Sequence, residues 1–239
     1  IIHPDVCSHP LSKTAFAKLN TFKDNLENGE TYSDEACKIN YKLNECTYTG
    51  DKIVIARSLN NYNYLRSFKD EASIHFHKYL PTTCELINDT TLIYKYPKRA
   101  LPISSIKTLE QKHANWVLSR LLEFCGWLNQ IGVCHAGITP DSIYIVPEEH
   151  GIICTSFYHV TQLDQRLRTI SGKYSRFYPS TVLETKLAKS NIDIALSKRT
   201  AIYLLGDASG NGTVLRKTHN EEIIDYLQIP EYDPLLSYS

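Results

Sequence analysis

The sequence has 239 residues, of which 42% are hydrophobic, and it carries 26 basic and 26 acidic side chains. This length and apolar content allow one large domain with a sizeable core and exclude a largely disordered chain. The formal net charge of zero argues against broad electrostatic binding to nucleic acid or an anionic membrane, and no apolar run reaches the roughly 20 residues of a membrane-spanning helix.

The seven cysteines are widely spaced and form no C-x-x-C pair, which indicates free thiols in a reducing cytoplasm. Two pairs of potential ligands, His75 with His77 and Cys134 with His135, are better explained by packing, because a zinc site needs clustered ligands. We therefore expect neither a metal nor a cofactor. The sequence contains no methionine, which is unusual at this length, so local motifs carry more weight here than long spacings.

The first segment, residues 1–36, joins a His-Pro-Asp tripeptide to a predicted amphipathic helix over 11–28. The tripeptide and the helix pattern "AFAKLNTFKDNL" resemble the second half of the J-domain of DnaJ-type co-chaperones. The resemblance implies that His3, Pro4 and Asp5 contact a DnaK-type chaperone. The helices that precede the tripeptide in that family are not present in this sequence. The alternative is a packing helix that the tripeptide precedes by chance.

Residues 37–100 predict a small α+β lobe. Short β-branched and aromatic runs over 38–59 predict a β-hairpin that turns at a Gly-Asp pair. Apolar residues at helical spacing predict one helix over 62–80, which a proline then ends. Two further strands are predicted over 83–89 and 90–97, and prolines beyond them mark a hinge to the next lobe.

Residues 101–239 predict a mainly helical lobe. The segment 109–132 is the strongest helix of the chain, and it is apolar over most of its circumference, which is typical of a central buried helix. Two short strands are predicted over 142–146 and 151–157, joined by a turn. A second long helix is predicted over 190–207, and the Gly-rich run after it is interpreted as a flexible loop, because it does not connect a strand to a helix.

This order of elements resembles the catalytic region of protein kinases, in which an H-R-D-x-x-x-x-N loop precedes a D-F-G triplet. In "HAGITPDSIYI", His135 takes the place of the kinase histidine, and Gly137 takes that of the aspartate that receives the substrate proton. Thr139 replaces the following lysine, and Ser142 replaces the metal-binding asparagine. The neighbouring Asp141 could be a displaced acid, but a turn residue beside a proline is the simpler interpretation.

The resemblance continues beyond this loop. In "TSFY", Ser156 takes the place of the magnesium-binding aspartate and Phe157 keeps the phenylalanine, while "FYPSTVLE" resembles the A-P-E region. Asp193 matches the aspartate that anchors the catalytic loop. Glu71 falls where the glutamate of the kinase αC helix would be. The strand lysine would correspond to residue 56 or 57, an alanine or an arginine. The implied fold is a two-lobed, α+β kinase-like fold.

Phosphoryl transfer depends on positioning and on magnesium held by carboxylate and amide oxygens. Gly137, Ser142 and Ser156 supply none of these groups, and no G-x-G-x-x-G loop precedes them. His135 and Asp193, which support the loop rather than the phosphates in the kinase family, are retained. A kinase framework that keeps its supporting residues but lacks the catalytic and metal-binding groups predicts a pseudokinase.

We expect a non-catalytic binding or scaffold protein in the cytoplasm that has a protein partner, does not bind ATP and could act as a co-chaperone adaptor. The alternative is an atypical ATP-dependent kinase or phosphotransferase with rearranged acids. A third reading is metal-independent nucleotide binding as a structural switch. Nucleotide binding with and without magnesium separates the three.

Overall fold

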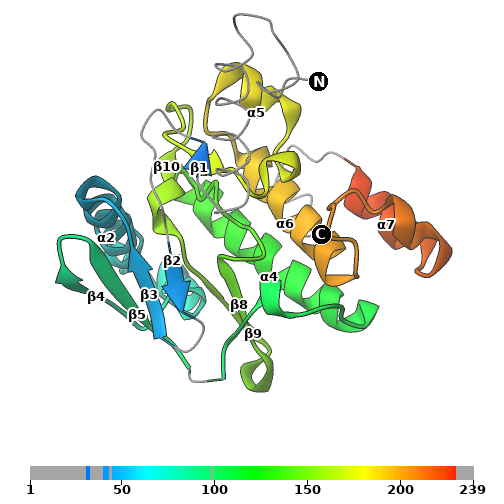
Figure 1. The fold of residues 1–239 in the computed structure, drawn as a ribbon, viewed down its shortest axis with the longest axis horizontal. Helices are drawn as coiled ribbons and strands as arrows, with labels where there is room; N and C mark the ends of the chain where they lie inside the picture. The colour runs from blue at the N-terminus through cyan, green and yellow to red at the C-terminus, as the bar shows by residue number, and fades with distance from the viewer. Residues whose placement is uncertain (1–30, 33–39, 43–44, 98, 230–239) are drawn as a thin grey trace, which may run out of the picture.

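A computed structural model of the chain describes residues 31–32, 40–42, 45–97 and 99–229. Figure 1 shows a small sheet and one helix at one side of the molecule, beside a larger, mainly helical part. Among the described residues, no helix is long and apolar enough to cross a membrane. The tripeptide and the helix predicted for the first segment lie outside the described residues.

The smaller lobe is built on an antiparallel sheet of four strands in the order β2-β3-β5-β4. Their bounds are Asn40–Lys42 for β2, Glu45–Thr49 for β3, Thr83–Asn88 for β4 and Thr91–Lys95 for β5. The strands predicted over 83–89 and 90–97 are therefore confirmed. Tyr48 pairs with Leu92 across β3 and β5, and Cys84 pairs with Tyr94 across β4 and β5. Alternation along β5 buries Leu92 and Tyr94, which face the core.

The second half of the hairpin predicted over 38–59 is wrong, because residues 52 onward form the helix α2 (Lys52–Ser67). The run Ile53 to Ile55 is β-branched, and this local preference favoured a strand. Burial follows a helical spacing instead, since the inward residues of α2 recur about every four positions: Val54, Ile55, Ser58, Tyr62 and Leu65. Packing against the rest of the lobe therefore overrides the local propensity.

The single helix predicted over 62–80 is also wrong, because the chain bends after Ser67. The short helix α3 (Glu71–Phe76) starts anew at Asp70, whose carboxylate accepts the backbone N–H of Ser73 at 2.9 Å. Such a cap starts a helix by satisfying one of its free N–H groups. A 3-10 turn, η1 (His77–Tyr79), leads from α3 to Pro81, where the helical segment ends as predicted.

The larger lobe is organised around two long helices that pack on each other, α4 (Gln111–Gln130) and α6 (Ser190–Leu204), and both predicted helices are confirmed. Half of the α4 residues are buried, including Leu121, Phe124 and Leu128. Gly132 has a φ of +75° just beyond α4, which is the conformation that a glycine supplies at a helix end. The remaining helices are α5 (Ser180–Thr185) and α7 (Glu221–Gln228).

Short strands connect the two lobes. β6 (Leu101–Pro102), β8 (Ile143–Val146) and β9 (Gly151–Cys154) form an antiparallel sheet, which confirms the two strands predicted over 142–146 and 151–157. Two further pairs join β7 (Val133–Cys134) to β10 (Thr161–Gln162), and β1 (Thr31–Tyr32) to β11 (Ile170–Ser171). The 3-10 turns are η2 (Ile103–Ser105), η3 (Pro147–Glu149), η4 (Phe157–His159), η5 (Ser175–Phe177) and η6 (Thr213–Lys217).

One hydrophobic core runs through both lobes. A column of aromatic rings crosses it: Tyr48 packs on Tyr94 with ring centroids 5.0 Å apart, Tyr94 on Phe157 at 5.5 Å, and Phe157 on His135 at 5.9 Å. Tyr62 of α2 adds a further contact to Phe157 at 5.5 Å. The sheet of the small lobe is thus held directly on the loop that carries the predicted site.

Candidate functional site

The loop after β7 is held by one carboxylate from the first turn of α6. Asp193 is 2% exposed, and its two oxygens accept the backbone N–H groups of His135 at 2.7 Å and Ala136 at 2.8 Å. Burial raises the pKa of Asp193 to about 6, and the two backbone donors oppose this shift by favouring the charged form. Asp193 therefore makes the loop contact that the kinase resemblance implies for it.

His135 is fully buried at the start of this loop. Its Nδ1 accepts the backbone N–H of Gly137 at 3.2 Å, so the imidazole shapes the turn that follows. Burial is the main cause that lowers the pKa of His135 to about 3, and the nearby His159 adds to the shift. The ring is neutral near pH 7 and acts as part of the core.

Gly137, which the kinase resemblance places at the catalytic aspartate, has no room for a side chain. A Cβ atom built on it would lie 2.7 Å from Cδ2 of His159 and 3.2 Å from Cβ of the same residue. Cβ atoms do not approach other atoms so closely in practice, so either the loop or His159 would have to move. The imidazole of His159, which is 4% exposed, therefore fills the space that a catalytic carboxylate would need.

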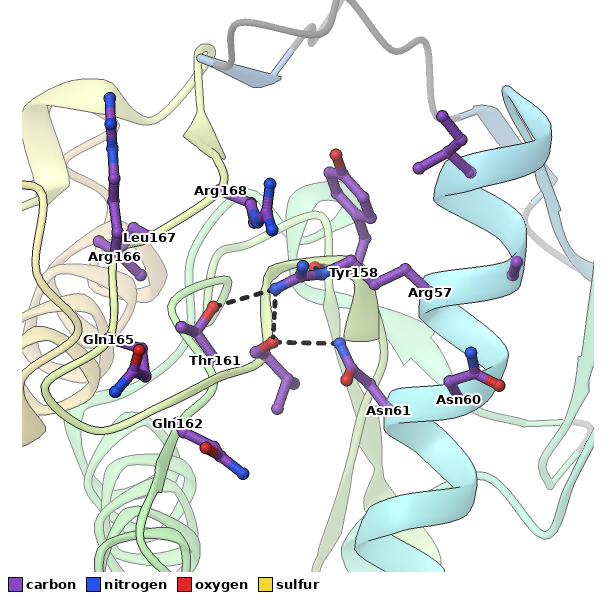
Figure 2. A pocket seen from close by; sticks show the side chains of 13 residues that line it. Arg57, Asn60, Asn61, Tyr158, Thr161, Gln162, Gln165, Arg166, Leu167 and Arg168 are labelled. Carbon is purple, nitrogen blue, oxygen red and sulfur yellow. Dashed lines mark hydrogen bonds between the residues drawn. The ribbon is translucent and has the colours of Figure 1, made fainter.

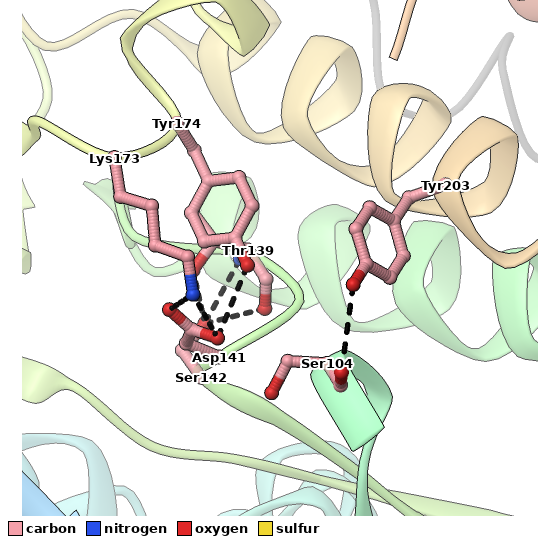
Figure 3. Close-up of polar contacts among 7 residues, drawn as sticks. All are labelled: Ser104, Thr139, Asp141, Ser142, Lys173, Tyr174 and Tyr203. Carbon is pink, nitrogen blue, oxygen red and sulfur yellow. Dashed lines mark hydrogen bonds and ion pairs between the residues drawn. The ribbon is translucent and has the colours of Figure 1, made fainter. Parts of the chain in front are cut away.

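Ser142, which the kinase resemblance places at the metal-binding asparagine, is turned into its own loop (Figure 3). Its hydroxyl accepts the backbone N–H of Thr139 at 2.9 Å and donates to the carbonyl oxygen of Gly137. Both Ser142 and Thr139 are buried, with exposed fractions of 1% and 4%. These hydroxyls close the loop on itself through hydrogen bonds between its own residues.

Asp141 is held by the segment that follows β11 (Figure 3). Its carboxylate accepts hydrogen bonds from Nζ of Lys173 at 2.7 and 3.0 Å and from the hydroxyl of Tyr174 at 3.1 Å. An acid committed to a cation and a phenol is not placed as a proton acceptor for a substrate. The geometry favours the interpretation of Asp141 as a turn residue.

Ser156, which the kinase resemblance places at the magnesium-binding aspartate, has a left-handed backbone with a φ of +62°. The hydroxyl of Tyr48 in β3 lies 2.6 Å from its Oγ and 2.8 Å from Oγ1 of Thr155. Thr155 in turn donates to the carbonyl oxygen of Ser142 at 2.8 Å. A chain of neutral hydroxyls therefore occupies the region in which a kinase holds charged groups.

Tyr48 was not identified from the sequence. It belongs to the strand that directly precedes α2, and its hydroxyl reaches Ser156, the residue that the kinase resemblance places at the magnesium-binding aspartate. The assignment of the lysine position to Ala56 or Arg57 is wrong, because both residues lie in α2 rather than in a strand. Comparison of β3, rather than residues 52–59, with the kinase strand would have led to the segment that contains Tyr48.

The assignment of Glu71 to the αC glutamate is also wrong. Glu71 is exposed in the first turn of α3, whereas α2 is the helix that packs against residues 157–161. From α2, Asn61 donates to the carbonyl oxygens of Phe157 at 2.8 Å and Val160 at 3.1 Å. The Asn61 amide therefore joins α2 to the backbone of residues 157–160.

The described residues contain no group of three or more His, Cys, Asp or Glu side chains that could hold a metal ion. His75 is placed near Glu123 and Lys78 on the surface. Cys134 is fully buried, and burial raises the pKa of its thiol well above its usual value. The Gly-rich run after α6 is organised around the carboxylate of Asp207, which accepts the backbone N–H of Gly212 at 2.8 Å.

No protein-family model matches the chain, and no curated protein matches it. Solved structures that resemble it are kinase domains. ROP2 from Toxoplasma gondii, described as a virulence factor with a protein-kinase fold and no enzymatic activity, has a TM-score of 0.55 at 11% identity, with 94% of this chain and 91% of that chain covered. The kinase domain of a Toxoplasma gondii specific rhoptry antigen has a TM-score of 0.54 at 10% identity, with 87% and 82% covered.

A third kinase domain has a TM-score of 0.52 at 10% identity, with 76% of this chain covered. The chain spans 65% of that domain, slightly less than two thirds of its length. At these identities the likeness concerns the fold alone. The chain has a kinase-like fold in which helix and sheet are mixed.

Proposed function

We propose that this chain is a non-catalytic, kinase-like protein that works by binding a partner. The observation that carries the proposal is the contact of the Tyr48 hydroxyl with Ser156 and Thr155, at 2.6 and 2.8 Å. This contact commits Ser156, which the resemblance places at the metal-binding aspartate, to a hydrogen bond with a neutral phenol. The kinase-like fold remains, while these paired hydroxyls supply no carboxylate for phosphoryl transfer.

Charge supports the same proposal. A magnesium ion in a phosphoryl-transfer site is bound by one or two carboxylates together with phosphates and waters. Here the two metal-binding positions carry hydroxyls, and Ser142 and Ser156 both make hydrogen bonds within the protein. Gly137 cannot accept a proton, and His159 occupies the space beside it. The two serines lack a carboxylate or amide ligand, and Gly137 lacks a proton acceptor, so no single substitution would restore transfer.

The rival function is an atypical phosphotransferase with rearranged acids, and a thermal-shift titration with ATP tests it. We expect no shift in Tm with ATP, with or without magnesium, because the hydroxyls of Ser142 and Ser156 offer no carboxylate for magnesium and are already hydrogen-bonded within the protein. A shift that requires magnesium, together with phosphate transfer from ATP, would refute the proposal. A shift without magnesium would instead support nucleotide binding as a structural switch.

A more specific role is that of a co-chaperone adaptor. It rests on the sequence motif His3-Pro4-Asp5, which resembles the tripeptide by which J-domains stimulate a DnaK-type ATPase. The proposal expects the full chain to stimulate that ATPase and the substitution His3→Gln to abolish the effect. An unchanged ATPase rate with the unsubstituted chain would remove this role and leave the non-catalytic proposal intact.

A further inference from the structure

The strand β4 forms one edge of the sheet in the small lobe. It comes last in the order β2-β3-β5-β4, and β5 is the one strand that pairs with it in the part of the chain that the structure describes. Figure 1 shows β4 at the margin of the molecule, on the side away from the larger lobe. An edge strand presents backbone N–H and C=O groups on its outer side, and these can pair with a further strand.

The second half of β4 exposes apolar side chains. Residues 85–88 are all exposed, and Leu86 and Ile87 keep 48% and 56% of their surface. Single exposed apolar residues are common on protein surfaces, but these two are large, consecutive and placed on an edge strand. The pairing with β5 is regular from Thr83 to Leu86 and shifts between Leu86 and Asn88. A regular strand that ends in two apolar side chains is therefore accessible at this edge.

The edge has few of the features that keep other strands away. Natural edge strands are protected by lysines, prolines, bulges or inward-pointing charges. β4 contains neither lysine nor proline, and the register shift near its end is its one irregularity. Its single charged side chain, Glu85, forms an ion pair with Lys95 of β5. The strand is therefore close to neutral and should not repel a second strand of the same sequence.

The helix α2 holds β4 at both of its ends. Before the strand, the hydroxyl of Tyr62 and Nη2 of Arg66 donate to the carbonyl oxygen of Thr82 at 3.2 and 3.0 Å. Beyond the strand, Nζ of Lys52 donates to the carboxylate of Asp89 at 2.7 Å. A strand that is already fixed in its extended form loses little entropy when it pairs, which favours association.

On another side, α2 is fixed to the segment that follows β9 (Figure 2). Arg57 donates to the carbonyl oxygens of Tyr158 at 3.0 Å and Val160 at 3.2 Å, and Asn61 also donates to that of Val160, at 3.1 Å. Arg57 and Asn61 line a pocket of about 970 Å³ there, whose other wall is the loop 165–168. Since these contacts hold the helix from a different side, a strand can add to β4 without moving α2.

We propose that β4 pairs with β4 of a second copy of the chain, antiparallel and about a twofold axis. A second copy supplies an edge of the same kind, and a contact of this symmetry uses one patch on both partners. An axis close to Leu86 sets apolar side chains of the two copies beside each other and keeps the two Glu85 carboxylates from standing directly opposite. The inference goes beyond the proposed function, because it depends neither on lost catalysis nor on another protein.

Sedimentation equilibrium of the full chain tests the proposal. An edge of six residues makes a small interface, so we expect a weak dimer that is a minority at about 1 µM and a majority at about 100 µM. Leu86→Lys places a charge on the edge and should raise the Kd of the dimer at least about tenfold. Leu183→Lys is the matched control, because Leu183 is 54% exposed in α5 of the larger lobe, and it should leave the Kd unchanged.

Hydrogen exchange of the unsubstituted chain gives a second measurement that needs no variant. The backbone amides of 83–88 should exchange more slowly at about 100 µM than at about 1 µM, whereas those of β3, which is paired on both sides, should not change. A chain that stays monomeric at about 100 µM would overturn the inference. So would a dimer that Leu86→Lys leaves intact, or one that Leu183→Lys weakens equally.

Protection of 83–88 that is the same at every concentration would also overturn the inference, in favour of a segment of the same chain that covers the edge. None of these outcomes involves ATP or phosphate transfer, so the proposal of a non-catalytic protein is tested separately.

Discussion

The two faces of the segment 157–161 differ in whether they leave space for a ligand. On the face toward the loop after β7, side chains satisfy one another: Tyr48 bonds to Ser156, and His159 fills the space beside Gly137. On the face toward α2, carbonyl oxygens hold Arg57 and leave a pocket of about 970 Å³ with three arginines in its wall. The same backbone thus closes one site and helps to form another.

The comparison teaches that the proposed absence of catalysis involves packing as well as missing acids. A glycine or serine at a catalytic position could leave an empty space that water and ions enter. Here the His159 ring lies against Gly137, and Phe157, next to Ser156, belongs to the core. The pocket, in contrast, has five exposed polar residues in its lining, Asn60, Gln162, Gln165, Arg166 and Arg168, beside buried ones such as Val160 and Leu167. Substitutions on the first face should therefore affect stability more than substitutions of these exposed residues.

The largest expected effect on stability is that of Asp193→Ala, which acts on the loop after β7. It removes the acceptor of two buried backbone N–H groups, those of His135 and Ala136, so the free energy of unfolding should fall by about 3–5 kcal/mol. Urea denaturation measures this change. Asp141→Ala is the control, since its ion pair with Lys173 is partly solvated and should contribute about 1 kcal/mol or less. Similar losses for the two variants would contradict the structural role of Asp193.

Three buried titratable residues of this region, His135, His159 and Asp193, should also make stability depend on pH. The folded pKa is about 3 for His135 and about 4 for His159, against about 6.5 in the unfolded chain, so the unfolded state takes up their protons first on acidification. Their contribution is lost as the pH falls from 6.5 toward 4. Asp193 acts in the opposite sense below pH 6, because its raised folded pKa of about 6 makes the folded state bind a proton first.

The net loss between pH 7 and pH 5 should be about 3 kcal/mol, from about 2 for each histidine less about 1 for the aspartate. Urea denaturation at the two pH values gives this difference. His159→Phe removes one of the two titrating rings and should reduce the loss to about 1 kcal/mol. A loss that is unchanged in this variant would show that His159 titrates normally in the folded protein.

A smaller effect is expected from Gly137→Ala, which tests whether His159 excludes a side chain at the catalytic position. The added Cβ would lie 2.7 Å from the His159 ring, so the substitution should destabilise the fold by about 1–3 kcal/mol. Combination with His159→Ala should remove most of that added loss, which a double-mutant cycle measures. Gly151→Ala, with its nearest atom at 3.8 Å, is the control and should have little effect. Additive losses for Gly137 and His159 would contradict the steric account.

Much of the larger lobe could be predicted from the sequence, because its signals are long and periodic. The segment 109–132 repeats its apolar face over five helical turns, and Gly132 ends it, so local pattern and tertiary burial agree. The prediction for residues 51–59 was wrong because local pattern and tertiary burial disagree there. Their β-branched run was read as a strand, although the spacing of Val54, Ser58 and Tyr62 already fits one face of a helix.

The candidate site could be predicted only where neighbouring residues define it. The loop from His135 to Ser142 is contiguous, so its likeness to a kinase loop was visible in one line of sequence. Tyr48 and Ser156 are 108 positions apart, and no local pattern marks a tyrosine that will bond across such a distance. The pocket beside α2 escaped notice for the same reason, since its arginines come from separate elements that only the fold brings together.

The smallest of these effects, and the most direct test of how the closed face is held, is that of Tyr48→Phe. The ring remains, but Thr155 and Ser156 lose the hydroxyl that lies 2.8 and 2.6 Å away, so the free energy of unfolding should fall by about 1–2 kcal/mol. Tyr64→Phe is the matched control, because Tyr64 lies in α2 and is 39% exposed, and it should change stability by less than about 0.5 kcal/mol. If the two variants are equally stable, the hydroxyl contact is dispensable, and the aromatic column of Tyr48, Tyr94 and Phe157 alone must keep the cleft closed. ATP should still leave the Tm of Tyr48→Phe unchanged in that case, because removal of a hydroxyl supplies neither a carboxylate for magnesium nor space for phosphates.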